Sequence, residues 1–421
     1  RTVHTGLLEY KNVYRPARVV SYDKESGELV LHNYMDFDDL KDYVKISYEL
    51  TQDGLVISKG KLAEVSVAPH SEGKISLNIN VPENGKCYLK LIYQLKKEMP
   101  LLEKDHILGF DEIEVSQKDA KCQLAEKWLE KTSADSELQV NENDTQIHIK
   151  GREFAYTIDR RTALFTEMKF AGREYLNHPM ELNIWRAPTD NDMYIKSEWR
   201  KAHYDKAYTR AYTTEVVQGK HGVKITSHAS VVAETVQKIL DVTITWTIDA
   251  AGKIDADIEA TKDGEFPDLP RFGVRMFLDK KLADVRYFGM GPQESYRDKH
   301  QAASHGLYRA NIGDLHEDYI RPQENGSHYD CEYVELNNSR YGIVASAEKA
   351  FSFNASYYTQ EELEKKTHNY ELTESDSVVF CVDYALNGIG SNSCGPVVLD
   401  QYRFNDVLFR FQFTLVPYVK G

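Results

Sequence analysis

Hydrophobic and polar residues alternate with a period of two along most of this chain. In "VTITWTIDAAGKIDADIEA" (242–260), aliphatic or aromatic residues alternate with polar ones until Ala251-Gly252 interrupts the pattern. Alternation of this kind predicts strands that bury one face. The first 117 residues show the same pattern, with turns expected at Ser26-Gly27, Asp53-Gly54 and Asn84-Gly85.

The pattern divides the chain into three parts. Residues 1–117 predict an immunoglobulin-sized β-sandwich of short strands. Residues 118–137 are charged and poor in β-branched residues, which predicts a linker, at most with a frayed helix. Residues 138–421 predict two large sheets packed face to face, with a concave face able to hold a ligand. Helix is expected only at 196–205 and at 359–366, where Thr359 and Glu362 form a capping-box pattern.

Composition narrows the function. The 421 residues suffice for two or three domains, and the formal net charge of −14 argues against nucleic acid and anionic membranes as partners. No apolar run approaches the roughly 20 residues of a membrane span. Five scattered cysteines without a CxxC pair favour thiols in a reducing compartment, so we expect a cytoplasmic protein without bound zinc. The first residues lack both a Met and the apolar core of a signal peptide, as if the chain were cut from a larger protein.

Two polar motifs follow strand-like runs. In "WRAPTDND" (185–192), Pro188 bars a continuing strand and the Asp and Asn residues favour a turn. This segment is either an Asx turn in which Arg186 pairs with a carboxylate or the rim of a polar binding site.

In "FPDLPRFGVRM" (266–276), Arg271 and Arg275 share one face of a strand. If that face is buried, each arginine needs a carboxylate or a ligand oxyanion; otherwise both lie on the outer face.

Three loops are rich in groups that could meet a ligand. "YFGMGPQESYRDKHQAASHG" (287–306) carries Glu294 and His300, and its GxG lacks the context of a dinucleotide site. "YIRPQENGSHYDCEYVEL" (319–336) carries Glu324, Asn325 and His328, which suit acid–base work on a sugar or are ordinary loop residues. "DYALNGIGSNSCGP" (383–396) is either a loop close to a ligand or a plain surface loop.

In this order, the motifs "RAPTDND", "LPRFG", "YFGMGPQESYRDK", "RPQENG" and "NGIGSNSCGP" resemble the C-terminal region of the large β-galactosidases of glycoside hydrolase family 2. The opening "RTVHTGLLEYKNVYRPARV" is similar to the segment after the catalytic barrel in those enzymes. The resemblance covers essentially the whole chain. It implies an all-β fold: an immunoglobulin-like β-sandwich (1–117), a linker (118–137) and a galactose-mutarotase-like super-sandwich, the small-chain domain (138–421).

The resemblance also implies what other parts of the parent supply. In the family, the acid/base and nucleophile glutamates lie on a (β/α)8 barrel, together with any Mg²⁺ or Na⁺. We therefore expect no catalytic residue, metal ligand or cofactor in this chain, and no galactosidase activity of the chain alone. The expected partners are the barrel and N-terminal domains of the parent, the galactoside and, in the whole enzyme, further copies of itself.

In relatives, the loop after "DND" is mobile and close to the active site; here it is Met193–Arg200. Some relatives have "DDSW" in the last glycine loop, with its Trp stacked on sugar, whereas Cys394 stands near that position here. Tyr194 and Trp199 are the aromatic substitutes. The candidate substrate-binding residues are Arg186, Asp190, Asn191, Asp192, Tyr194, Trp199, Arg271, Glu294, Glu324, Asn325, His328, Asn392 and Cys394.

Two alternatives stay open. The sandwich type also suits a free-standing aldose 1-epimerase, with His328 or His300 as acid and Glu294 or Glu324 as base. A third possibility is a structural module that promotes oligomerisation and touches no sugar.

Overall fold

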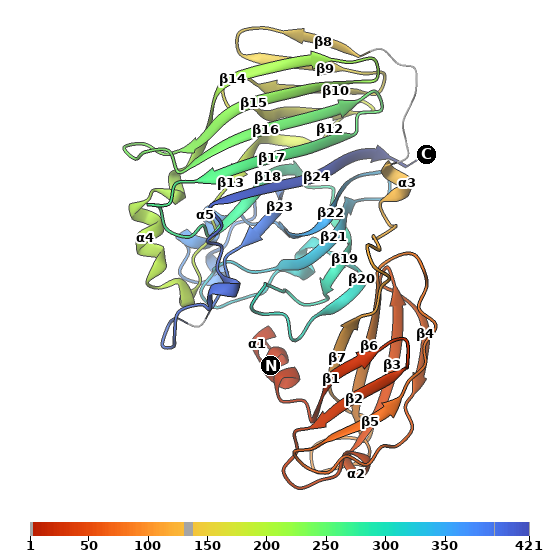
Figure 1. Ribbon diagram of the computed structural model, residues 1–421. Helices are drawn as coiled ribbons and strands as arrows, with labels where there is room; N and C mark the ends of the chain where they lie inside the picture. The colour runs from red at the N-terminus through yellow and green to blue at the C-terminus, as the bar shows by residue number, and fades with distance from the viewer. Residues whose placement is uncertain (1–2, 130–137, 391, 421) are drawn as a thin grey trace. The chain divides into compact units, whose positions relative to one another are not determined.

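The structure, a computed structural model, describes residues 3–129, 138–390 and 392–420 (Figure 1). These residues form two compact units. Unit 1 comprises the chain through Leu124 together with 288–293 and 300–308, and unit 2 comprises 125–287, 294–299 and 309–421. Both units are built mainly from antiparallel strands, so the all-β prediction is confirmed.

Unit 1 is a sandwich of two antiparallel sheets. One sheet has the order β1 (Ala17–Asp23), β2 (Glu28–Asn33), β5 (Glu72–Ser76), and the other has the order β4 (Leu55–Lys61), β3 (Val44–Gln52), β6 (Cys87–Leu95), β7 (Ile107–Glu114). Leu29 and Leu31 of β2 and Leu89 and Leu91 of β6 are fully buried in one hydrophobic core. The alternation that predicted these strands therefore marks the inward faces of both sheets.

The turn predictions in unit 1 have different outcomes. Asp53-Gly54 joins β3 to β4, and both residues have positive φ (47° and 78°), as a tight hairpin turn requires. Asn84-Gly85 instead lies between β5 and β6, which belong to opposite sheets. The strand prediction is wrong at the beginning of the chain, where Thr5–Val13 forms helix α1. A second, shorter helix, α2 (Leu40–Tyr43), precedes β3.

Unit 2 contains a small sheet and a large one. The small sheet has the order β12 (Arg173–Glu174), β11 (Leu164–Phe170), β10 (Phe154–Asp159), β9 (Gln146–Lys150), β8 (Gln139–Glu142). The main path of the large sheet is β13 (Leu176–Asn183), β18 (Arg271–Asp279), β23 (Ser377–Leu386), β22 (Tyr341–Ser356), β24 (Leu408–Val419), β17 (Ile254–Lys262), β16 (Leu240–Asp249), β15 (Gly222–Val232), β14 (Tyr208–Gln218). Beside this path, β21 (Ser327–Asn337) pairs with β22, and β19 (Asp284–Gly291) pairs with β21 and β20 (Ser304–Asn311). Residues 288–291 of β19 and 304–308 of β20 are counted with unit 1.

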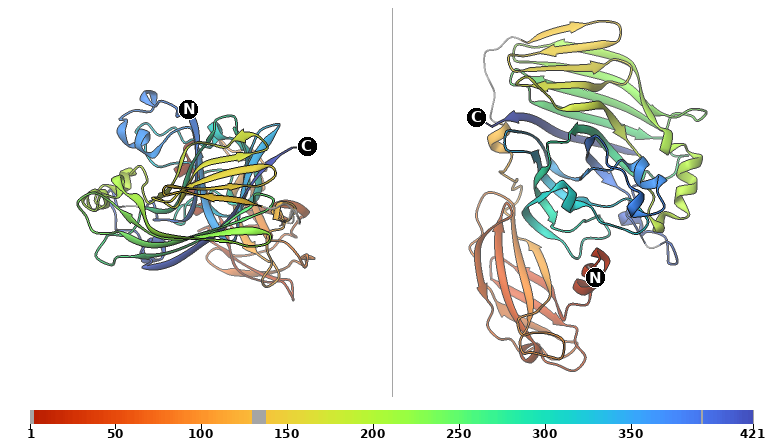
Figure 2. Two further views of the ribbon diagram at one scale, coloured as in Figure 1. Left: turned by 90° about the horizontal axis from the view of Figure 1, so that it is seen from above. Right: turned by 180° about the vertical axis from the view of Figure 1, so that it is seen from behind.

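The two sheets of unit 2 share a core, and the far face of the large sheet is polar. Trp246 of β16 packs edge-on against Phe165 of β11 at 4.9 Å between ring centroids, and its indole N–H donates to the Ala163 carbonyl. Figure 2 shows the small sheet lying over β14–β17. Because side chains alternate along a strand, Thr245, Asp257 and their neighbours face away from this core.

Helices in unit 2 are short: α3 (Glu126–Leu129), α4 (Ile195–Lys201), α5 (Gln360–Lys365) and the 3-10 turns η1 (Asp190–Asp192), η2 (Tyr204–Lys206), η3 (Ile312–Leu315), η4 (Asn369–Glu371) and η5 (Asp400–Tyr402). Thr359 caps α5 as predicted, because its hydroxyl accepts from the Glu362 N–H at 3.1 Å. The Glu362 carboxylate bonds elsewhere, to the Thr373 N–H. The predicted linker (118–137) includes α3, and residues 130–137 lie outside the described residues.

Candidate functional site

The segment after β13 turns sharply and carries a fully buried arginine. Pro188 cannot donate to a strand ladder, and the backbone N–H of Thr189 donates to the Asp192 carboxylate at 2.9 Å, which fixes the turn η1. Arg186 donates two hydrogen bonds to the same carboxylate, from Nε at 3.2 Å and from Nη2 at 2.7 Å. The interpretation of "WRAPTDND" as a turn closed by an arginine–carboxylate pair is therefore confirmed.

The glycine loop after β23 is attached to this turn. Arg186 also donates to the carbonyls of Asn387 and Gly388, and the side-chain amide of Asn191 donates to the Gly390 carbonyl. From the other side, the Asp298 carboxylate accepts from the backbone N–H groups of Ile389 (3.0 Å) and Gly390 (2.7 Å). The loop is thus held between two separate parts of the chain.

A second buried arginine lies next to the first. Arg271, at the start of β18, pairs with Asp383 of β23 through Nε (3.2 Å) and Nη2 (2.7 Å), and its Nη1 reaches Glu324 at 3.4 Å. The backbone N–H of Glu324 donates to the Ala187 carbonyl at 3.0 Å, which connects this pair to the "WRAPTDND" turn. We call Arg186, Asp192, Arg271, Asp383 and Glu324, with the loops they hold, the loop cluster.

Glu324 adds a negative charge that the loop cluster does not neutralise, because its two arginines and two aspartates already neutralise one another. Only 4% of Glu324 is exposed. Burial raises its pKa, against the attraction of Arg271 and Arg186. Within the described residues its Oε1 has no hydrogen-bond partner. Burial and the unpartnered oxygen therefore shift Glu324 toward the protonated form, relative to a solvated glutamate.

Glu294 lies in a neighbouring buried network. Its carboxylate accepts from Lys299, from the Tyr319 hydroxyl and from the Gly326 N–H, the last at 2.8 Å. Burial opposes ionisation, but Lys299 and these hydrogen bonds outweigh it and lower the pKa of Glu294. Partial burial and the nearby negative charge of Glu294 raise the pKa of Glu317 to about 7.

The predicted site residues separate into buried and accessible groups. The buried ones are Arg186, Asp192, Trp199, Arg271, Glu294, Glu324, Asn325 and His328, all at most 6% exposed. Asp190, Tyr194 and Cys394 are exposed, and Asn191 and Asn392 are half-buried. The accessible residues can touch a ligand, whereas the buried ones can only position others.

Two expectations about aromatic residues and the mobile loop need correction. Trp199 is fully buried: its indole N–H donates to the Asp268 carbonyl at 2.8 Å and its ring lies under the Arg186 guanidinium at 5.3 Å, so it cannot stack on a sugar. The segment Met193–Arg200, expected to be a loop from the relatives, is largely helix, because Ile195–Lys201 forms α4; this confirms the helix expected at 196–205. Tyr194, just before α4, is 59% exposed and remains the accessible aromatic candidate.

The buried acid–base candidates do not favour an epimerase. His328 is 1% exposed and packs against the rings of Tyr287 and Phe353, and Glu294 is held by Lys299. Asn325 accepts from the Glu317 N–H at 3.0 Å and donates to the Gln323 carbonyl, both local contacts. His300 is only half-buried and belongs to unit 1. A free sugar could not reach His328, Glu294 or Glu324 without a local rearrangement.

Sequence reasoning missed Asp383, Asp298 and Asn387, which organise the loop cluster. Asp383 and Asn387 lie within the quoted motif "DYALNGIGSNSCGP", and Asp298 lies within "YRDK". A carboxylate in the middle of the apolar run "VVFCVDYAL" (378–386) was the available signal, because a buried acid needs a cation.

Residues 3–129, 138–390 and 392–420 contain no group of three or more His, Cys, Asp or Glu residues that could hold a metal ion. No helix in the same residues is long and apolar enough to cross a membrane.

Chemically, the loop cluster is a scaffold with an accessible polar edge. Asp192 and Asp383 are each committed to an arginine, so they are poorly suited to proton transfer. Asp190, Asn191 and Tyr194 lie beside this scaffold and offer a carboxylate, an amide and an aromatic ring. Fold and site thus define an all-β protein with a pre-organised polar edge, suited to contacting a polar ligand.

Comparison with known proteins identifies the family. A family model described as "Beta galactosidase small chain" matches residues 150–415, and one described as "Beta-galactosidase, domain 4" matches residues 29–116. The chain belongs to the β-galactosidase small-chain family. The resemblance found from the sequence motifs is therefore confirmed.

Individual relatives agree. The chain is 43% identical over 418 residues to a β-galactosidase of Actinobacillus pleuropneumoniae, covering 99% of this chain and 40% of that protein. It is 31% identical over 420 residues to a β-galactosidase of Staphylococcus xylosus, covering 99% and 41%. Among solved structures, a galactose 1-epimerase from Lactobacillus acidophilus aligns with a TM-score of 0.37 and 10% identity, over 69% of this chain and 100% of that one. The chain spans about 40% of the length of the curated relatives it matches.

Proposed function

We propose that this chain is a non-catalytic part of a β-galactosidase that hydrolyses terminal β-D-galactosides. In this proposal, the catalytic carboxyl pair belongs to another part of the whole protein, together with any Mg²⁺ or Na⁺. The accessible edge of the loop cluster lines one side of the galactoside pocket. It positions the substrate and transfers no proton.

The observation that carries the proposal is that the buried carboxylates are already bound by cationic side chains of this chain. A retaining glycosidase needs two carboxyl groups about 5 Å apart, one of them free to exchange protons with the substrate. Asp192 and Asp383 are each held by two nitrogens of a buried arginine, and Glu294 is held by Lys299. Substrate-facing roles are left to Asp190, Asn191 and Tyr194.

The first experiment measures hydrolysis of nitrophenyl β-D-galactoside. We expect no hydrolysis above background by this chain alone, and hydrolysis by the whole protein. Appreciable turnover by the isolated chain would show that it carries its own acid and nucleophile, and would defeat the proposal.

The second experiment tests contact with the substrate in the whole protein. Tyr194→Ala removes an aromatic ring that is 59% exposed. We expect it to raise KM several-fold with a smaller change in kcat, because stacking adds binding to both the ground state and the transition state. The matched control is Tyr212→Ala on β14, which removes a ring that is 57% exposed and does not belong to the loop cluster. Equal effects of the two variants would count against the proposed position of the pocket, and would favour a module that does not touch sugar.

A further inference from the structure

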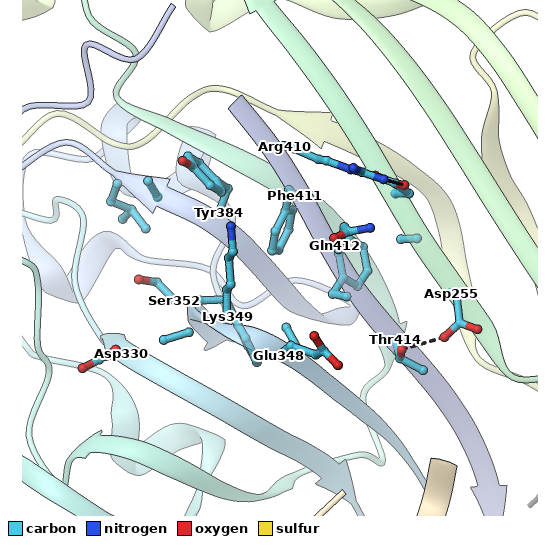
Figure 3. Close-up of a pocket in the computed structure, with 18 of the residues that line it drawn as sticks. Asp255, Asp330, Glu348, Lys349, Ser352, Tyr384, Arg410, Phe411, Gln412 and Thr414 are labelled. Carbon is cyan, nitrogen blue, oxygen red and sulfur yellow. Dashed lines mark hydrogen bonds and ion pairs between the residues drawn. The ribbon is translucent and has the colours of Figure 1, made fainter. Parts of the chain in front are cut away.

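A cavity of about 710 Å³ opens in the large sheet of unit 2, at the place where neighbouring strands separate. β22 pairs with β24 up to Ser346, and with β23 from Ser352 onward. Residues 347–350 pair with neither strand, and the cavity lies against this segment, β24 and the end of β23 (Figure 3). None of the candidate residues selected from the sequence lines it.

Two β-bulges direct side chains into the cavity. On β22, the four residues 347–350 lie opposite the single residue Glu332 of β21, because Tyr333 pairs with Ser346 and Cys331 pairs with Phe351. On β23, Tyr384 is extra relative to β18, between the pairs Phe272–Ala385 and Gly273–Asp383. Bulges re-aim side chains and are frequent beside binding sites. Here both inserted segments line the same cavity.

The carboxylates that line the cavity are engaged by the protein. Asp257 accepts hydrogen bonds from two nitrogens of Arg410. Asp255 accepts from the Thr414 hydroxyl at 2.7 Å and lies 3.2 Å from the Lys253 ammonium. Asp330 and Glu348 also interact with other protein groups.

Two of the cations at the cavity, Lys349 and Arg297, have no carboxylate partner within the described residues. Within the described residues, Lys349 makes no hydrogen bond or ion pair, and it is exposed at the cavity wall. Arg297 is half-buried and donates to the Arg403 carbonyl at 2.8 Å, with no carboxylate partner in the described part of the chain. A partly desolvated guanidinium is stabilised by an anion, so the cavity favours a negatively charged group.

A buried hydroxyl and an aromatic ring complete the lining. Ser352 is only 5% exposed, and in the described residues its hydroxyl has no hydrogen-bond partner, although it lines the cavity. Tyr384 stacks on Phe409 at 5.0 Å, which fixes the orientation of its ring. Figure 3 shows Lys349, Ser352 and Tyr384 around the opening. Hydroxyl and aromatic groups together suit a polyhydroxylated ring with an apolar face.

We propose that this cavity binds a sugar that carries a carboxylate or a phosphate group. Lys349 and Arg297 hold the oxyanion, Ser352 bonds a hydroxyl, and Tyr384 contacts the ring. None of the five charged residues of the loop cluster lines this cavity, and the proposal does not depend on the proposed catalytic role of the whole protein. Net charge alone does not predict such an anion site, because a protein with a formal net charge of −14 repels anions from most of its surface.

Titration calorimetry on this chain tests the proposal with four probes: galacturonate, galactose 6-phosphate, galactose and inorganic phosphate. We expect at least one of the two charged sugars to bind, roughly tenfold more tightly than both galactose and phosphate, because a charged hydrogen bond adds to the ring contacts. The stronger of the two identifies the oxyanion. A pH-independent affinity between pH 6 and 9 would be expected for galacturonate, whose carboxylate stays ionised.

Variants locate the binding. Lys349→Gln should fold, because it changes an exposed side chain, and Tyr384→Phe, which removes only a hydroxyl and keeps the ring, is the folding control for Tyr384→Ala. We expect Lys349→Gln to weaken the charged sugar roughly tenfold and to leave galactose unchanged. Tyr384→Ala should weaken the charged sugar but not inorganic phosphate. The matched control is Lys220→Gln, an exposed lysine outside the cavity lining, which should change nothing.

Four results would overturn the proposal: no binding of either charged sugar at millimolar concentration, equal binding of galactose, equal binding of inorganic phosphate, or binding that Lys349→Gln leaves unchanged. The last result would place the ligand elsewhere on the chain.

Discussion

Arg271 and Arg275 lie on the same strand and the same face, yet they have different surroundings. Arg271 is fully buried, and the side chains of its partners, Asp383 and Glu324, are 0% and 3% exposed. Arg275 pairs with Glu181 and Glu361, whose side chains are 45% and 54% exposed. The first arginine is part of a closed charge network, and the second reaches the surface of unit 2.

The difference shows where a buried charge constrains the fold. If Arg275 is removed, water can solvate both glutamates. If Arg271 is removed, Asp383 stays buried without a cation, and that costs far more than a surface pair contributes. The loop cluster contains the closed network, so the polar edge is built on the buried pair.

The largest effect is expected from Arg271→Met. Loss of one partner of a buried pair costs about 3–5 kcal/mol in the free energy of unfolding. Arg275→Met, the matched control on the same strand, should cost about 1 kcal/mol, since its partners become solvated. Urea unfolding followed by tryptophan fluorescence measures both, because all four tryptophans lie in unit 2. Equal losses would contradict the distinction between the two sites.

A smaller loss is expected from Gly273→Ala, between the two arginines. An added Cβ would lie 2.3 Å from the Val382 carbonyl oxygen and 2.4 Å from Asp383 Oδ1. Such overpacking costs about 1–3 kcal/mol. The control is Gly264→Ala, where nothing lies within 4 Å of the added atom. If thermal unfolding shows no difference between the variants, Asp383 is not held as tightly as its contacts indicate.

The smallest effect on stability is expected from Glu324→Gln, with a defined pH dependence. Burial raises the folded-state pKa of Glu324 above its ordinary value of 4.5. Below pH 4.5 both states are protonated and the substitution changes little. As the pH rises above 4.5, the unfolded state releases its proton first, so the wild type loses stability that the glutamine variant keeps. The variant should therefore gain relative to the wild type between pH 4.5 and 7. A relative loss over this range would mean that Glu324 is ionised in the fold.

Much of the fold follows from short-range patterns. Alternation over 242–260 placed β16 and β17, and Asp53-Gly54 placed a hairpin whose two positive φ values few other residue pairs tolerate. Thr359 marked the start of α5. Each of these signals involves residues that are close in sequence, so it can be recognised without knowledge of the tertiary contacts. The strand prediction for the start of the chain was wrong, because Thr5–Val13 is helical.

The site was predictable only in part. The motifs named the arginines, and the rule that a buried arginine needs a carboxylate was correct for both Arg271 and Arg275. The partners could not be named, because Asp383 is 112 positions from Arg271. Burial of Trp199 depends on how α4 packs, and the cavity at Tyr384 depends on a register shift between β18 and β23. Neither property leaves a mark in the local sequence.

The most direct test of the loop cluster is Asp298→Asn in the whole protein, measured as the pH profile of kcat/KM for nitrophenyl β-D-galactoside. Asp298 accepts from the backbone N–H groups of Ile389 and Gly390, and an amide can satisfy only one of them well. We expect kcat/KM to fall roughly tenfold at every pH, with both limbs of the profile unmoved, because the loop is displaced while the acid and the nucleophile are intact. An unchanged kcat/KM would show that the glycine loop does not shape the pocket, and the loss of one limb would show that this chain supplies a proton-transferring group.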